Sequence, residues 1–165
     1  MDYKIGDIVV HWTHGLGKVI AIEEMQLSGG RQEYYVVEVG LLKLWVPTDE
    51  ANEGSLRFPL EGDEFKQLLN SLQTPGEKLP ENYTKRKVEL RERIEKRTLK
   101  GLCLLIRDLT DHSNHHTLNL NDSAVLFRAE AYLLDEWVLS LGVEREEAQS
   151  ELNLFLRSEQ PGICG

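Results

Sequence analysis

Residues 5–24 read IGDIVVHWTHGLGKVIAIEE, and this stretch decides the fold of the first part of the chain. Ile8 to Trp12 is rich in strand-forming residues, and His14 to Gly17 supplies glycines that tolerate the positive φ angles of a hairpin turn. Lys18 to Glu24 continues as a second strand. One face of that strand is expected to carry Val19, Ala21 and Glu23, and the other Ile20 and Ile22. The stretch therefore predicts a half-buried β-hairpin.

Further short strands follow this hairpin. Ser28 to Gly30 forms a turn that leads into Arg31 to Val39, whose Tyr-Tyr-Val-Val centre suits a strand covered on both faces. Leu42 to Val46 adds a strand that Pro47 stops, and Arg57-Phe58 adds a short fifth one. Strands of this length with loops of a few residues commonly close on themselves, because closure removes exposed edges. We expect a small SH3-like or Tudor-like barrel.

The pattern becomes helical from residue 62 onward. Large apolar side chains at i, i+3, i+4 and i+7 predict the first helix, and these are Phe65, Leu68, Leu69 and Leu72. Three more helices are expected. One is capped by Thr84 and runs to about Leu99, and a second spans 102–109. The third is capped by Asn121 or Asp122 and ends at Gly142. Leu152, Phe155 and Leu156 give a fifth helix its apolar face, while Thr110 to His116 reads as a polar loop. The fold class is therefore α+β, with a compact all-helical second half.

Length and composition favour two small cores. The chain has 165 residues, of which 41% are hydrophobic, and the change from strands to helices near residue 60 separates the cores. We expect domains at 1–60 and 61–160 and a tail at 161–165. The longest apolar run is short and no export signal precedes it, which indicates a cytoplasmic protein. Of the two cysteines, Cys103 is expected in a core and Cys164 in the tail, and nothing supports a disulfide between them.

Positive charge is concentrated in one segment of this acidic protein. Residues 81–107 contain nine Lys and Arg against four Glu, a net charge of +5. The whole chain has a net charge of −9, so the residues outside this segment sum to −14. Tyr83 stands just before the Lys85-Arg86-Lys87 run, and an aromatic side chain beside cations suits a surface that contacts phosphates and bases. The same segment contains i, i+4 pairs such as Lys85 with Glu89, which an ordinary solvated helix also shows. Charge alone leaves both interpretations open.

Other candidates for chemistry are weaker. Imidazole and carboxylate groups that suit zinc or manganese gather at Asp108, Asp111, His112, His115 and His116. A polar loop explains this cluster more simply, so we expect no metal site and no cofactor. The chain has no phosphate-binding loop, dinucleotide fingerprint or nucleophile motif. We therefore expect a protein that is not an enzyme.

Ordered motifs along the chain resemble the CarD/CdnL family. In the first half these are GDIVV at 6–10, HGLG at 14–17, EYYVV at 33–37, and VP at 46–47 ahead of GSLR at 54–57. They are similar to a module that the family shares with the transcription-repair coupling factor, in which it is the domain that interacts with RNA polymerase. In the second half, PENYTKR at 80–86 resembles a family Pro-x-x-Trp segment followed by basic residues, and IRDL at 106–109 its Val-Arg-Asp-Leu.

The resemblance implies a bacterial transcription regulator. The first domain would dock on the polymerase β subunit through an exposed strand edge, and the helical domain would contact promoter DNA and modulate open-complex stability. The implied polymerase-binding residues are Met25, Leu42, Lys43, Leu44, Trp45 and Val46. The implied DNA-binding residues are Tyr83, a minor-groove wedge, with Lys85, Arg86, Lys87 and Arg91 at phosphates. The alternative is a protein-interaction adaptor with no DNA affinity.

This sequence departs from the family pattern at several positions. His11-Trp12 stands where the family usually has Tyr-Pro, and Met25 and Trp45 stand at positions that are usually basic. Trp45 is either an apolar anchor for a partner or a core residue. Tyr83 replaces a tryptophan, so it is either a smaller wedge or a side chain packed on the helical domain. Whether the protein activates or represses, and at which promoters, stays open.

Overall fold

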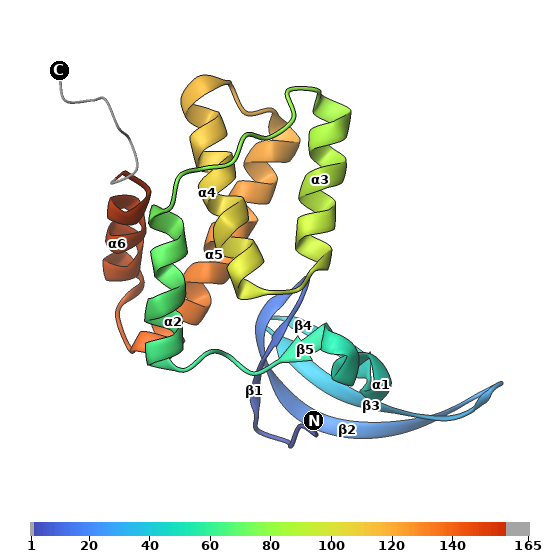
Figure 1. Cartoon of the computed structure of the whole chain (residues 1–165). Helices are drawn as coiled ribbons and strands as arrows, with labels where there is room; N and C mark the ends of the chain where they lie inside the picture. The colour runs from blue at the N-terminus through green and yellow to red at the C-terminus, as the bar shows by residue number, and fades with distance from the viewer. Residues whose placement is uncertain (1, 158–165) are drawn as a thin grey trace. The chain divides into compact units, whose positions relative to one another are not determined.

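The computed structural model describes residues 2–157, which divide into two compact units, the first ending at Pro59 and the second beginning at Leu60 (Figure 1). The first unit contains the strands and the second contains the long helices. The α+β class expected from the sequence is confirmed.

The first unit is one antiparallel sheet with the strand order β4-β3-β2-β1-β5. Its strands are β1 (Ile8–His11), β2 (Gly15–Leu27), β3 (Gly30–Val39), β4 (Leu42–Pro47) and β5 (Leu56–Arg57). A short helix, α1 (Thr48–Glu50), and the helical turn η1 (Ala51–Ser55) connect β4 to β5. Within the described residues no pairing joins β4 to β5, so the expected closure into a barrel is not observed. The two-residue β5 pairs with β1 alone, and β4 keeps an open edge.

β2 and β3 form a long hairpin (Figure 1). A β-bulge in this hairpin reverses the faces on which the β2 side chains lie. Val19 pairs with Val37, whereas Ala21 pairs with Val36, so Ile20 is the extra residue on β2. Because successive side chains alternate in direction, the extra residue places Val19 on the core face and Ala21 on the opposite face. The prediction that Val19 shares a face with Ala21 and Glu23 is therefore wrong for Val19.

The core of the first unit lies on one face of the sheet. It consists of Tyr3, Val9, Val19, Tyr35, Val37, Val46, Ala51 and Leu56. The Tyr3 hydroxyl donates to the carbonyl oxygen of Leu56 at 2.9 Å, and its ring meets the ring of Tyr35 edge-on. On β3, Val36 is buried as well as its two neighbours, which confirms that the centre of this strand is covered on both faces.

Within its described residues, 60–157, the second unit contains five α-helices, as the apolar periodicity predicts. They are α2 (Gly62–Leu69), α3 (Tyr83–Glu95), α4 (Leu99–His115), α5 (Leu120–Leu141) and α6 (Arg145–Arg157), and α2 is extended by the turn η2 (Asn70–Gln73). Phe65, Leu72 and Trp137 are completely buried in their shared core, together with Cys103. Cys164 and the tail at 161–165 lie outside the described residues. In the described part of the chain, no helix is long and apolar enough to cross a membrane.

Three helix boundaries differ from the sequence-based expectation, and the first is the start of α4, at Leu99 rather than Leu102. The segment Thr110–His116 was expected to be a loop, but α4 continues to His115 because His112 is buried one turn beyond buried Leu109. Helix α3 ends at Glu95 rather than near Leu99, since Arg97 adopts a left-handed φ of 58°. The last two boundaries are therefore decided by a contact or a backbone angle that the local apolar pattern does not reveal.

The helix caps are also displaced by a few residues from the expected ones. Asn82, rather than Thr84, caps α3 by accepting from the Lys85 backbone N–H at 3.0 Å. Asn119 caps α5 in a reciprocal capping box with Asp122. Gly142 ends α5 with a φ of 64°, as expected.

Candidate functional site

The open edge of β4 presents the residues expected to bind a protein partner. Leu42, Lys43 and Trp45 are exposed, Leu44 is partly buried on the core face, and Val46 is buried. In a two-residue hairpin the residues flanking the turn form a hydrogen-bonded pair, and hydrogen-bonded and non-hydrogen-bonded pairs then alternate along the strands. Residues of a non-hydrogen-bonded pair direct their backbone groups away from the partner strand. Since Val39 pairs with Leu42 across the turn, Lys43 and Trp45 direct their backbone N–H and C=O groups to the open edge.

Trp45 is a surface residue. Its side chain is 45% exposed, and its indole N–H donates to the Glu23 carboxylate at 3.0 Å. The interpretation of Trp45 as a core residue is therefore wrong. Met25 lies two residues after Glu23 on the same face of β2 and is partly buried. The structure thus brings Met25, Lys43 and Trp45 to the outer face of the sheet and adds Glu23, which sequence reasoning missed. Leu42, Leu44 and Val46 lie on the core face instead.

The first turns of α3 present an aromatic side chain and cations. Tyr83 is 47% exposed at the first position of the helix, and Lys85, Lys87 and Arg91 are exposed along it. Residues four apart fall on one stripe of a helix, so Tyr83, Lys87 and Arg91 share a stripe, whereas Lys85 lies on the other flank. The cluster on one face therefore has three members.

Arg86 differs from its neighbours because it is buried. Its guanidinium forms a bidentate ion pair with Asp122, with Nη2 to Oδ2 at 2.9 Å, and it also donates to the carbonyl oxygens of Pro80 and Glu81. The side chains of Arg86 and Asp122 are 7% and 1% exposed. The expectation that Arg86 contacts phosphates is not supported, because its donors are already used inside the helical unit. Arg86 joins the start of α3 to the start of α5.

Other cations of the positive segment are occupied in the same way. Arg93 and Arg107 both bind the carboxylate of Asp108, which is 1% exposed and also accepts from the Glu77 backbone N–H at 2.8 Å. Three of the nine cations in residues 81–107 thus hold buried carboxylates. The other six are Lys85, Lys87, Arg91, Lys96, Arg97 and Lys100. The surface is less positive than the sequence count suggests.

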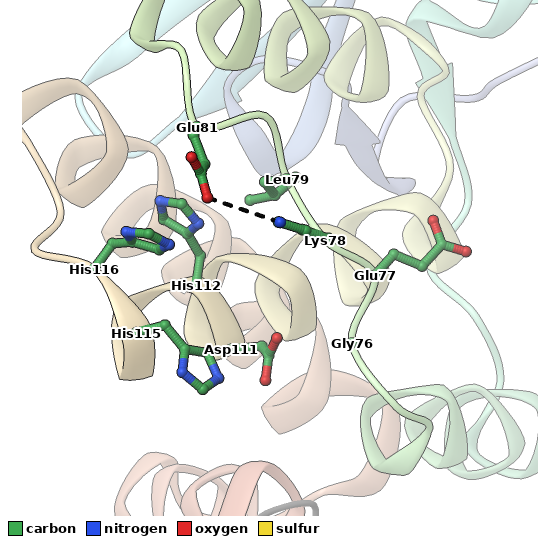
Figure 2. A pocket seen from close by; sticks show the side chains of 9 residues that line it. All are labelled: Gly76, Glu77, Lys78, Leu79, Glu81, Asp111, His112, His115 and His116. Atoms are coloured by element: carbon green, nitrogen blue, oxygen red, sulfur yellow. Dashed lines mark ion pairs between the residues drawn. The ribbon is translucent and has the colours of Figure 1, made fainter.

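A cavity of about 370 Å³ gathers the histidines of the second unit (Figure 2). Asp111, His112, His115 and His116 line it together with residues 76–79 and Glu81. The rings of His112 and His116 stack with their centroids 4.5 Å apart, and the Glu77 carboxylate points away from them (Figure 2). Asp108 is directed to its arginines instead. Among residues 2–157 there is no group of three or more His, Cys, Asp or Glu side chains arranged to hold a metal ion.

The electrostatic environment of His112 favours its neutral form. Burial lowers the pKa of His112 below its ordinary value, and the positive charges of Arg86 and His116 lower this pKa further. Asp122 and Asp111 oppose this shift. His112 thus lies within electrostatic range of the same buried ion pair that fixes the start of α3.

Comparison with known proteins adds information on both units. The family model described as "CarD-like/TRCF RID domain" matches residues 3–58, and the model "CarD, C-terminal domain" matches residues 67–153. The chain is 22% identical to the putative transcription factor YdeB of Bacillus subtilis over 150 residues, which cover 90% of this chain and 98% of that protein. It is 29% identical over 96 residues to the transcription-repair-coupling factor of the same organism, covering 51% of this chain and 8% of that protein.

Proposed function

The chain belongs to the CarD family, and from this premise we propose that it is a cytoplasmic regulator that binds bacterial RNA polymerase and contacts promoter DNA. The family is one of transcription factors and interaction domains, which fits the expectation of a protein without catalysis. The observation that supports the proposal most strongly is that one unit has an open strand edge and the other has an exposed stripe of aromatic and basic side chains.

The proposed polymerase contact is strand addition at β4. An open edge offers unpaired backbone groups to an extended segment, and the flanking side chains add specificity. Lys43 and Trp45 supply the outward backbone groups, while Leu42 and Leu44 offer apolar surface on the core face. We expect the polymerase β subunit to contribute the pairing strand, since the first unit matches the domain model shared with transcription-repair-coupling factors.

A proline substitution in β4 tests the strand contact. Lys43→Pro removes an outward N–H without removing a bond to β3, so polymerase binding should weaken at least tenfold. Lys43→Gln is the matched control, because it removes the charge and keeps the backbone donor, and it should bind nearly as the wild type does. Equal binding by Lys43→Pro and wild type, with the fold intact by circular dichroism, would exclude strand addition at this edge.

The proposed DNA contact is the stripe of Tyr83, Lys87 and Arg91. Cations that neutralise phosphates make binding depend on salt but carry no sequence information, and an exposed aromatic ring can insert at a base step in the minor groove. Lys85 on the other flank can contact the neighbouring phosphate backbone. Arg86 is left out of this surface because it is buried.

A salt series distinguishes DNA binding from the adaptor alternative. Each neutralised phosphate contact contributes about 0.9 to the slope of log K against log salt concentration, so Lys87→Gln with Arg91→Gln should reduce the slope by about 1.8. Lys66→Gln, an exposed cation on α2, is the control and should leave the slope unchanged. Wild-type protein that binds polymerase but not promoter DNA would favour the adaptor.

The open-complex lifetime tests the role of the aromatic ring. We expect the protein to change the lifetime of promoter open complexes formed by the polymerase of its source organism, and Tyr83→Ala to abolish most of this change. Tyr83→Phe is the matched control, because it keeps the ring and loses only the hydroxyl. If Tyr83→Ala acts as the wild type does, the wedge is refuted even where DNA binding is retained.

A further inference from the structure

The outer face of the sheet carries an aromatic and acidic surface at the open edge of β4. We call this surface the Trp45–Glu23 site, and it consists of these two side chains with Tyr34 and Met25 beside them. Trp45 and Glu23 are joined by the 3.0 Å hydrogen bond from the indole N–H, and both are exposed. The β-bulge at Ile20 is what brings Glu23 to this face.

Glu23 has no cation opposite it on the sheet. Its cross-strand partner is Tyr34, and its neighbours on the same face of β2 are Ala21 and Met25. The ion pairs found in residues 2–157 include none with Glu23. A carboxylate accepts about four hydrogen bonds, and the indole uses one of them. Glu23 therefore offers negative charge and open acceptor positions beside the ring of Trp45.

The other carboxylate on this face lies between cations. Glu38 on β3 pairs across the sheet with Lys18 on one side and with Lys43 on the other. These three side chains form a ladder in which charges alternate. The negative charge that remains without a cationic neighbour is thus concentrated at Glu23, next to the edge on which a strand can add.

A cationic side chain matches this arrangement. A strand paired to β4 places alternate side chains on the two faces of the extended sheet. On the outer face, a Lys or Arg beside Trp45 would lie against the exposed ring and within reach of Glu23, which combines a cation–π contact with charge attraction. On the opposite face, Leu42 and Leu44 favour apolar side chains.

We propose that the polymerase segment that pairs with β4 presents a basic side chain to Trp45 and Glu23 and apolar side chains to the core face. The inference rests on the proposed function for the identity of the partner, and it specifies the chemistry of that partner's strand. The site selects a strand in which basic and apolar residues alternate, and it rejects a strand that places a carboxylate beside Glu23.

Charge reversal at Glu23 tests this inference, which predicts that binding to the polymerase becomes weaker. Binding of the full-length protein to RNA polymerase core enzyme of its source organism is measured by fluorescence anisotropy. We expect Glu23→Gln to weaken binding about fivefold, the upper range for an exposed ion pair, and Glu23→Lys to weaken it by about 10- to 30-fold. Glu24→Lys is the matched control, because it makes the same charge change on the opposite face of β2 and should change binding less than twofold.

Each alternative occupant gives a different result. If polymerase binds and Glu23→Lys leaves binding unchanged or tightens it, the partner strand is not basic and the inference is overturned while the proposed function stands. If wild-type protein does not bind polymerase, the proposed function fails, and the inference fails with it. Concentration-dependent dimers that Lys43→Pro abolishes would identify a second copy of the chain as the occupant and would also overturn the inference. Circular dichroism of every variant confirms that it is folded.

Discussion

Arg86→Met should destabilise the helical unit severely. Removal of the guanidinium leaves the Asp122 carboxylate, 1% exposed, without its cation, and leaves the carbonyl oxygens of Pro80 and Glu81 without their donor. Removing one partner of a buried ion pair costs about 3–5 kcal/mol, because an uncompensated charge stays in the interior. We expect a loss of this size in the free energy of unfolding, which corresponds to a midpoint about 12–25 °C lower for a unit of this length.

Urea unfolding followed by circular dichroism at the helical minimum measures this loss, since the long helices lie in the second unit. Arg145→Met is the matched control, because the Arg145–Asp135 pair is 52% and 42% exposed and should be worth at most about 1 kcal/mol. Arg86→Met combined with Asp122→Leu should recover part of the loss, since apolar side chains replace buried ion pairs well, while the capping bond to Asn119 and the donors to Pro80 and Glu81 stay lost. A loss below about 1 kcal/mol for Arg86→Met alone would refute the argument.

Three further predictions concern single positions in the helical unit. Because the pKa of His112 is lowered from 6.5, the unfolded chain takes up the proton at higher pH, so this contribution to stability is full above about pH 6.5 and declines as the pH falls. His112→Gln should narrow the difference in unfolding free energy between pH 7.5 and pH 5.5, and an unchanged difference would contradict this assignment. Gly142→Ala should cost about 1 kcal/mol in urea unfolding because φ is 64°, with Gly142→Asn less costly, and equal costs for the two would count against a left-handed cap. Asn119→Ala should also cost about 1 kcal/mol by thermal unfolding, whereas a neutral result would mean that water replaces the cap.

Much of the fold was predictable because it depends on local patterns. The strands around residues 8–24 and the helical stripe from Phe65 to Leu72 follow from apolar periodicity and from glycine turns, which act over a few residues. The open sheet was not predictable in the same way. Closure depends on whether the last strand is long enough to pair with β4, and the chain forms only a two-residue β5 after α1 and η1.

In the candidate site, too, some features follow from local sequence patterns and others depend on contacts between distant residues. The exposed positions of Tyr83, Lys87 and Arg91 agree with a helix that presents cations to solvent. Arg86 could not be distinguished from Lys85 and Lys87 by sequence, because its partner Asp122 is 36 residues away and meets it only when α3 and α5 pack together. A helical wheel centred on Leu90 would have been the available signal, since it places Arg86 on the buried side.

The bulge on β2 makes the pairing of this strand as important as its composition. A deletion of Ile20 would restore continuous pairing with β3 and would leave every later side chain of β2 on its present face, because Ala21 would follow Val19 directly and would still pair with Val36. If Ile20 paired with Val36 instead, with no residue removed, Glu23 would turn to the apolar side and Ile22 would take its place beside Trp45. A relative of the same sequence length whose strands pair without the bulge would therefore present a different surface to its partners.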